Sequence, residues 1–324
     1  MDAWSRINEF MGSSRPHVVI VTGKGGVGKT TVSIALSDAL SGAGRTLVVS
    51  LDQAMHLKEY LSLPSTHRVH RVREGLDALQ FDLEKEVDRL SRDYALLLQQ
   101  IMPGLKVFNL EGVTEAVRNA PGFEEEIYVR ALYDLYNRDY DYVVIDTPPT
   151  GVTLRMLNMP LLYRFWLENL VSLRERIVSI RYVIARTLNE EYSPDDPVLR
   201  RLEELKERYS RLYDMLRDGE KTSAVIVATP EPLPVFEARK TLEALKRIGV
   251  ETKMVVINKV VPDVVAERLG VKEVQDRSIK ELVSLDCGGC MKIMVPMHES
   301  LPSSLESARQ AMKSARIVES AGSA

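Results

Sequence analysis

The segment Gly23–Thr30 constrains the fold of this chain more than any other feature. It reads GKGGVGKT and matches the pattern G-x-x-x-x-G-K-[ST], with the apolar run His17–Thr22 before it and a helical run to Leu40 after it. A strand, a glycine-rich loop and a helix in this order form the phosphate-binding loop (P-loop) of nucleotide-hydrolysing proteins. A glycine-rich turn without a ligand is the alternative, and the flanking strand and helix argue against it.

The chemistry of the loop follows from its residue types. Glycines let backbone N–H groups converge on phosphate oxygens, at a helix N-terminus that favours negative charge. We expect Lys29 to reach the β- and γ-phosphates and the hydroxyl of Thr30 to ligate Mg²⁺. The predicted nucleotide-binding residues of the loop are Gly23, Lys24, Gly25, Gly26, Val27, Gly28, Lys29, Thr30 and Thr31.

Apolar runs rich in Val, Ile and Leu recur along the chain, as is typical of strands buried on both faces of a parallel sheet. Helical patterns separate most of them, so the predicted fold class is α/β, a doubly wound and mainly parallel sheet with an inserted α-helical subdomain. The expected strands are His17–Thr22, Thr46–Leu51, Leu76–Leu83, Leu105–Leu110, Tyr142–Asp146, Ser223–Thr229, Thr252–Asn258 and Lys292–Pro296.

Two helical stretches interrupt this alternation. The first, at about 84–138, is expected to hold the helices Glu84–Met102 and Phe123–Arg138. The second, at about 151–219, should divide near 194–197, because proline disrupts helix interiors and aspartate favours helix caps. We therefore expect one P-loop ATPase domain over 1–324, with a helical subdomain formed by these stretches.

Composition narrows the class of protein. Hydrophobic residues make up 45% and charged residues 27%, which is ordinary for a globular chain. A net charge of −3 gives no indication of a nucleic-acid partner. No run of about 18 uncharged apolar residues and no secretory signal is evident, and two cysteines make no disulfide framework. We expect a cytoplasmic protein.

Two aspartates follow predicted strands. Asp146 ends Tyr142–Asp146, where open α/β sheets place ligand contacts, and such an aspartate holds Mg²⁺ in P-loop enzymes. Asp52 follows Thr46–Leu51 and is either a helix cap or a residue that orients or deprotonates the attacking water. Thr30 and Asp146 are thus the candidate Mg²⁺ ligands.

The loop and its switches resemble a known group of ATPases. Lys24 gives the loop the deviant Walker form of the MinD-like group, in which the extra lysine reaches the other subunit's nucleotide across a dimer interface; a solvated lysine is the alternative. The sequence DTPPTGVTLR at Asp146–Arg155 resembles the second switch, DTAPTGHTLR, of the arsenite-efflux and tail-anchored-protein-targeting ATPase family. DQAMHL from Asp52 resembles its first switch, and Pro121–Glu125 its P-G-I-D-E element.

The resemblance runs from about residue 16 to 310 and implies an ATP- and Mg²⁺-dependent homodimer. It makes Asp52, Lys24 and Lys29 the candidate catalytic residues. Asn258 matches the asparagine that reads adenine, and Pro296 belongs to the final strand, whose following loop also holds the base. The switch histidines of the family are absent, since Met55 and Val152 stand in their positions, and we expect the coupling of the switches to the helical subdomain to differ accordingly.

Cys287 and Cys290 form a C-x-x-C motif. One motif from each subunit would give a four-sulfur Zn²⁺ site at a dimer axis, as in the targeting ATPases. Their motif, however, precedes a long helix, whereas here it follows one (about Gln275–Leu285), and the aligned position, Pro262–Val265, holds no cysteine. A metal site, a redox-switched dithiol and an inert turn stay open.

The segment Gly151–Ala185 is too charged to span a bilayer and unusually apolar for a surface. Ordinary packing of an amphipathic helix is one interpretation. In the targeting ATPases this region lines a groove for a client's transmembrane helix, and methionine suits such a surface because it is adaptable. The candidate groove residues are Met156, Met159, Leu162, Phe165, Trp166 and Leu170.

The leading hypothesis is a targeting factor for tail-anchored membrane proteins, which would deliver its hydrophobic clients to a membrane receptor and contact the membrane during delivery. One alternative is the catalytic ATPase of an arsenite or anion efflux pump, although that subunit is typically a tandem duplication and this chain has one P-loop. Another is a MinD- or ParA-like positioning ATPase, which lacks the second switch and the helical insert. A regulator that binds nucleotide and hydrolyses it poorly is the non-enzymatic alternative.

Overall fold

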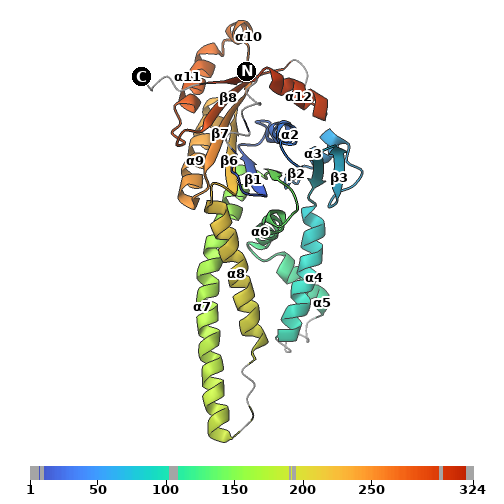
Figure 1. The fold of residues 1–324 in the computed structure, drawn as a ribbon, viewed down its shortest axis with the longest axis vertical. Coiled ribbons are helices and arrows are strands. Elements are labelled where there is room, and N and C mark those ends of the chain that lie inside the picture. The colour runs from blue at the N-terminus through green and yellow to red at the C-terminus, as the bar shows by residue number, and fades with distance from the viewer. Residues whose placement is uncertain are drawn as a thin grey trace.

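The computed structural model describes residues 7, 11–101, 109–189, 191, 195–298 and 302–318. Within them the strands form one nine-stranded sheet in the order β3-β4-β2-β5-β1-β6-β7-β8-β9 (Figure 1). All neighbouring strands from β4 to β8 are parallel, and β3 and β9 add antiparallel edges. The strands are β1 (His17–Thr22), β2 (Thr46–Ser50), β3 (Val69–Arg73), β4 (Leu76–Gln80), β5 (Tyr142–Asp146), β6 (Thr222–Ala228), β7 (Thr252–Val260), β8 (Met291–Pro296) and β9 (Arg316–Ile317).

Helices cover both faces of the sheet, which confirms the predicted α/β class. They are α2 (Lys29–Leu40), α3 (His56–Leu61), α4 (Leu83–Ile101), α5 (Leu110–Arg118), α6 (Phe123–Tyr136), α7 (Thr150–Leu188), α8 (Pro197–Arg217), α9 (Pro232–Ile248), α10 (Asp263–Arg268), α11 (Lys272–Val283) and α12 (Leu305–Lys313).

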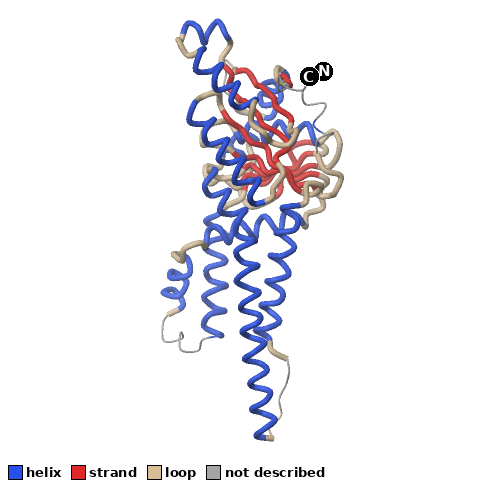
Figure 2. Tube along the Cα trace, turned by 90° about the vertical axis from the view of Figure 1, so that its left-hand side faces the viewer, coloured by secondary structure: helices blue, strands red, loops and turns tan. Residues whose placement is uncertain are grey.

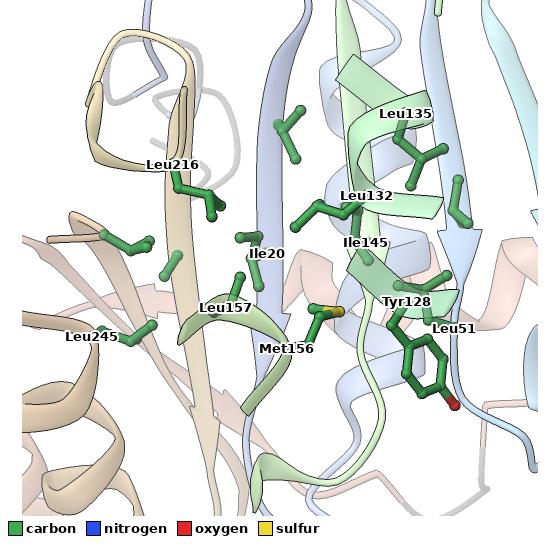
Figure 3. Close-up of a cluster of buried hydrophobic side chains, with 14 of the residues drawn as sticks. Ile20, Leu51, Tyr128, Leu132, Leu135, Ile145, Met156, Leu157, Leu216 and Leu245 are labelled. Carbon is green, nitrogen blue, oxygen red and sulfur yellow. The ribbon is translucent and has the colours of Figure 1, made fainter. Parts of the chain in front are cut away.

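The alternation of side chains along each strand divides the core between the two faces. In β1, Val18 and Ile20 join a cluster with α6, α7, α8 and α9, while Val19 and Val21 join a second cluster with α2 and α12. Successive strand residues point to opposite faces, so a strand covered on both sides must be apolar throughout. Figure 3 shows part of the first cluster, in which Ile20 lies close to Leu157.

The helical insertions project from the sheet. α7 and α8 pack along each other and extend well beyond it, and α4 projects on the same side (Figures 1 and 2). α7 has 39 residues, which corresponds to a length of about 60 Å. No helix in the described ranges is both long and apolar enough to cross a bilayer.

The break between α7 and α8 lies where it was predicted. Asp196 is the N-cap of α8, and its side chain accepts a hydrogen bond from the Leu199 N–H at 2.8 Å. The guanidinium of Arg174 on α7 donates to both carboxylate oxygens of Asp196, at 3.1 and 2.7 Å. One aspartate therefore starts α8 and ties it to α7.

The predicted strand Leu105–Leu110 is wrong where it can be checked. Leu110 begins α5, because the Asn109 side chain caps that helix by accepting a hydrogen bond from the Gly112 N–H at 2.9 Å. Residues 105–108 lie outside the described residues. The other predicted strands are confirmed, although the one that starts at Leu76 ends at Gln80, since Leu83 already begins α4.

Candidate nucleotide site

The P-loop connects β1 to α2 at the carboxyl edge of the parallel strands. Gly28 is the N-cap of α2 with φ of 95°, and its carbonyl accepts the Val32 N–H at 3.0 Å. A Cβ at Gly28 would lie 2.3 Å from Nδ2 of Asn258, so both the backbone angle and the space require glycine. The loop therefore opens α2 in the strand–loop–helix arrangement that the motif predicts.

Thr30 and Asp146 meet below the loop. The Thr30 hydroxyl donates to Oδ2 of Asp146 at 2.8 Å, and the Ser50 hydroxyl at the end of β2 donates to the same oxygen at 3.1 Å. Asp146 is fully buried, and its Oδ1 has no hydrogen-bond partner among the described residues. A buried carboxylate oxygen without a partner is costly unless a proton or a cation satisfies it.

The pKa of Asp146 is shifted in the direction expected for a buried carboxyl group. Burial raises the pKa of Asp146 to about 6, and the hydrogen bond from Thr30 and the charge of Lys29 oppose the rise. Mg²⁺ prefers oxygen ligands and commonly takes only one or two carboxylates from the protein beside substrate phosphates. Thr30 and Asp146 thus supply oxygen atoms of the kind that Mg²⁺ takes as ligands. Their assignment as magnesium ligands stays a prediction.

Asp52 lies in the turn after β2. Its Oδ1 accepts the Ala54 N–H at 3.1 Å, and its own N–H donates to the Ser50 hydroxyl at 3.3 Å. Met55, with φ of 53°, is the N-cap of α3, so Asp52 does not cap that helix. Ser50, which the sequence analysis missed, therefore connects the first switch to Asp146.

A cleft of about 370 Å³ opens over the loop. It brings together these predicted site residues: Gly25, Gly26, Gly28, Lys29, Thr30, Thr31, Asp52, Asn258 and Pro296. Of the other predicted residues, Gly23, Val27 and Asp146 are buried behind its wall, and Lys24 is half-buried outside the lining. Some other lining residues lie in segments that the resemblance had marked: His56 and Pro149 in the two switches, and Val295, Met297 and His298 in the final strand and the residues after it. Tyr60, Lys259, Pro302, Ala311 and Met312 line the cleft without having been predicted.

Two side chains near the end of β7 donate hydrogen bonds to carbonyl groups of the P-loop. Nδ2 of buried Asn258 donates to the Val27 carbonyl at 2.8 Å. Lys259 adopts φ of 59°, and its ammonium group donates to the Gly26 carbonyl at 2.7 Å. This lysine adds a positive charge to the cleft, and its position beside Asn258 is the only sequence feature that points to it.

The second switch is tied to the helical subdomain. Nε of Arg155, in the first turns of α7, donates to Oε1 of Glu125 in α6 at 2.8 Å. The structure thereby joins two segments that carry the family resemblance, Pro121–Glu125 and Asp146–Arg155. α7 begins four residues after Asp146, so a short segment joins this aspartate to the helix.

The structure does not support a zinc site at the C-x-x-C motif. Cys287 and Cys290 are joined by a disulfide, and a disulfide sulfur is not the thiolate ligand that Zn²⁺ takes. Among the described residues, no group of three or more His, Cys, Asp or Glu side chains is placed to hold a metal ion. A redox-switched dithiol stays a prediction.

The prediction that Met156 lines the client groove is wrong. Met156 is fully buried and points into the core cluster near Tyr128 and Leu157 (Figure 3), so it lines no groove. Met159 is partly buried against the same core. The helix turns these methionines towards the sheet, because they lie in its first turns, where α7 still covers the sheet.

An apolar groove of about 480 Å³ lies farther along α7. Leu162, Trp166 and Leu170 line it, whereas Phe165 is exposed on the same stretch of the helix without lining it. The other lining residues are Tyr94, Ala120, Pro121, Gly122, Phe123, Glu126, Tyr163, Leu167, Leu205 and Tyr209.

Comparison with known proteins identifies ATPases as relatives of this chain, in agreement with the nucleotide site. The anion-transporting ATPase family matches residues 16–288. A protein of Aquifex aeolicus (strain VF5) named "Putative arsenical pump-driving ATPase 2" is 31% identical over 272 residues, which cover 82% of this chain and 88% of that protein. The ATPase GET3A of Arabidopsis thaliana is 30% identical over 76% of this chain and 67% of its own length. The ATPase ASNA1 homolog 1 of Paramecium tetraurelia is 27% identical over 76% of this chain and 75% of its own length. The chain therefore belongs to the anion-transporting ATPase family and is an ATPase.

Proposed function

We propose that this ATPase is a homodimeric, cytoplasmic targeting factor that captures the hydrophobic segment of tail-anchored membrane-protein clients in its helical subdomain. In this proposal the ATP-bound dimer holds the client, hydrolysis opens the dimer, and the client passes to a membrane receptor. One observation carries the proposal: large apolar side chains are exposed on α7 beside the apolar groove.

That exposure is unusual for a folded surface. Leu162, Phe165, Trp166 and Leu170 are 46%, 63%, 58% and 41% exposed. Monomeric proteins rarely expose large contiguous apolar patches, and such patches commonly mark binding sites. An apolar helix that packs into a hydrophobic groove is a recurring form of recognition, and it fits both the shape and the lining of this site.

In this proposal the residues of the cleft promote ATP hydrolysis by positioning the phosphates and the attacking water and by stabilising negative charge. Lys29 would pair with the β- and γ-phosphates, and Asp52 would orient or deprotonate the attacking water. Mg²⁺, when bound, neutralises charge on the phosphate oxygens, and Thr30 and Asp146 are the residues that would hold it. Lys24, half-buried outside the cleft lining, would act on the nucleotide of the second subunit.

Photocrosslinking tests the proposal. A tail-anchored substrate with a crosslinker in its apolar segment should label the wild type in the presence of ATP, and labelling should fall several-fold when Phe165→Ser and Trp166→Ser are combined. Val264→Ser combined with Leu269→Ser is the matched control, because these residues are 64% and 65% exposed and lie in α10 and at its end, outside the groove lining. Labelling that is independent of ATP, or equal in both variants, would reject the groove as the client site.

The catalytic ATPase of an anion efflux pump is the second candidate, favoured by the name of the Aquifex relative and by the family match. Arsenite in its trivalent form needs soft thiolate ligands. The chain's two cysteines, Cys287 and Cys290, are both held in the disulfide. Stimulation of the ATPase by arsenite under reducing conditions, lost in Cys287→Ser, would favour the pump over the targeting factor.

A further inference from the structure

A second polar cavity lies between the helical subdomain and the sheet. It has a volume of about 220 Å³ and shares no lining residue with the nucleotide cleft or the apolar groove. Its apolar part comes from the ends of β2 and β4 and from α6. Its polar part contains four arginines from three elements of the subdomain: Arg89 of α4, Arg130 of α6, Arg138 directly after α6, and Arg208 of α8.

The charges around this cavity do not balance. The Arg89 guanidinium is bound by Glu86, at 2.6 and 3.2 Å, and Glu86 also contacts His67 at 2.8 Å. Arg130, Arg138 and Arg208, in contrast, form no ion pair with any side chain of the described residues. Within the described part of the chain, Arg130 donates to the Tyr94 hydroxyl at 3.4 Å, and Arg208 lies over the Tyr133 ring.

The one remaining acid of the lining, Asp134, does not neutralise them. It forms no ion pair within the described part of the chain, and burial raises the pKa of its carboxyl. The charges of Arg208, Arg130 and Arg138 act against that rise. All three side chains line the same cavity as Asp134. The lining thus carries four guanidinium groups and two carboxyl groups, those of Glu86 and Asp134, while Glu126 outside the lining also acts on Arg130 and Arg208. A bound anion would balance the excess positive charge of the lining.

We propose that this cavity binds a tetrahedral oxyanion of the phosphate class, held by Arg130, Arg138 and Arg208. The planar fork of a guanidinium matches two oxygens of such an anion, and its charge strengthens the hydrogen bonds. The apolar side chains of Leu51, Leu79 and Phe81 form part of the wall. The anion would connect α6 to α8 and so fasten the helical subdomain at a point away from the nucleotide.

Calorimetry with the full chain tests this site. Inorganic phosphate also binds P-loops, so the titrations use the Lys29→Ala background, in which the loop has lost its phosphate-binding cation. We expect phosphate to bind at one site and to raise the melting temperature above that in chloride of equal ionic strength. Arg138→Gln combined with Arg208→Gln should weaken binding at least tenfold.

The matched control combines Arg176→Gln with Arg181→Gln, which removes the same charge from exposed positions of α7. Equal affinity in the two double variants, or no binding beyond the chloride control, overturns the proposal. If the first double variant fails to fold, Arg130→Gln provides the same test. Tighter binding of glycerol 3-phosphate than of inorganic phosphate would identify a phosphate ester as the ligand, and the reverse would identify free phosphate.

Discussion

The fully buried Asp146 makes the stability of the empty protein depend on pH in a defined direction. Folding raises the pKa of this carboxyl from 3.8 to about 6, chiefly through burial. The protonated form is therefore favoured in the folded state, and its contribution is fully present below the unfolded pKa. It is lost as pH rises through the folded pKa. At about 1.4 kcal/mol per pKa unit, this loss amounts to about 3 kcal/mol by pH 8.

Asp146→Asn removes the titration while keeping a side chain of similar shape that can accept the hydrogen bond from Thr30. In the absence of nucleotide and magnesium, the variant should gain stability relative to the wild type between pH 4 and pH 8, by up to about 3 kcal/mol. Urea unfolding of both proteins across this range, with EDTA present, measures the difference, and other titrating groups cancel in the comparison. Parallel curves for the two proteins would refute the assignment of a buried, unsatisfied carboxylate.

Two further substitutions test the geometry of the loop and of the helical subdomain. Gly28→Ala should weaken ATP binding at least tenfold in calorimetry, because its Cβ would lie 2.3 Å from Nδ2 of Asn258 at a φ of 95°; unchanged affinity would contradict the loop geometry. Asp196→Ala should lower the free energy of unfolding by about 1–3 kcal/mol, because it removes the cap of α8 and the two bonds from Arg174. A loss below about 0.5 kcal/mol in urea unfolding would show that this pair does not stabilise the turn.

The strands that form the centre of the sheet could be predicted because their residues are apolar on both faces. β3 escaped prediction because its sequence, VHRVR, carries three polar side chains and lies at an exposed edge. Leu105–Leu110 looked like another strand, but the apolar run contains the start of a helix whose cap, Asn109, gave no periodic pattern. Local apolarity thus identifies buried strands well and edge strands poorly.

In the candidate site, too, some residues could be predicted from local sequence patterns and others could not. The P-loop and Asp146 were predicted because a motif at fixed spacing and the end of a buried strand place them. Ser50 and Lys259 act through contacts between segments that are remote in sequence, and apart from the position of Lys259 beside Asn258 no pattern indicates them. Met156 was assigned to the groove from the family resemblance, whereas its direction depends on which turn of α7 still covers the sheet.

The central claim is that this cleft hydrolyses ATP within a dimer, with Asp52 acting on the attacking water. The most direct test measures Mg²⁺-ATP hydrolysis and molecular mass in solution together, for the wild type and Asp52→Asn. We expect the wild type to hydrolyse ATP, and the variant to bind ATP and stay a dimer without turnover. A monomer with equal activity in both proteins would contradict it, because neither Asp52 nor Lys24 would then take part in the mechanism.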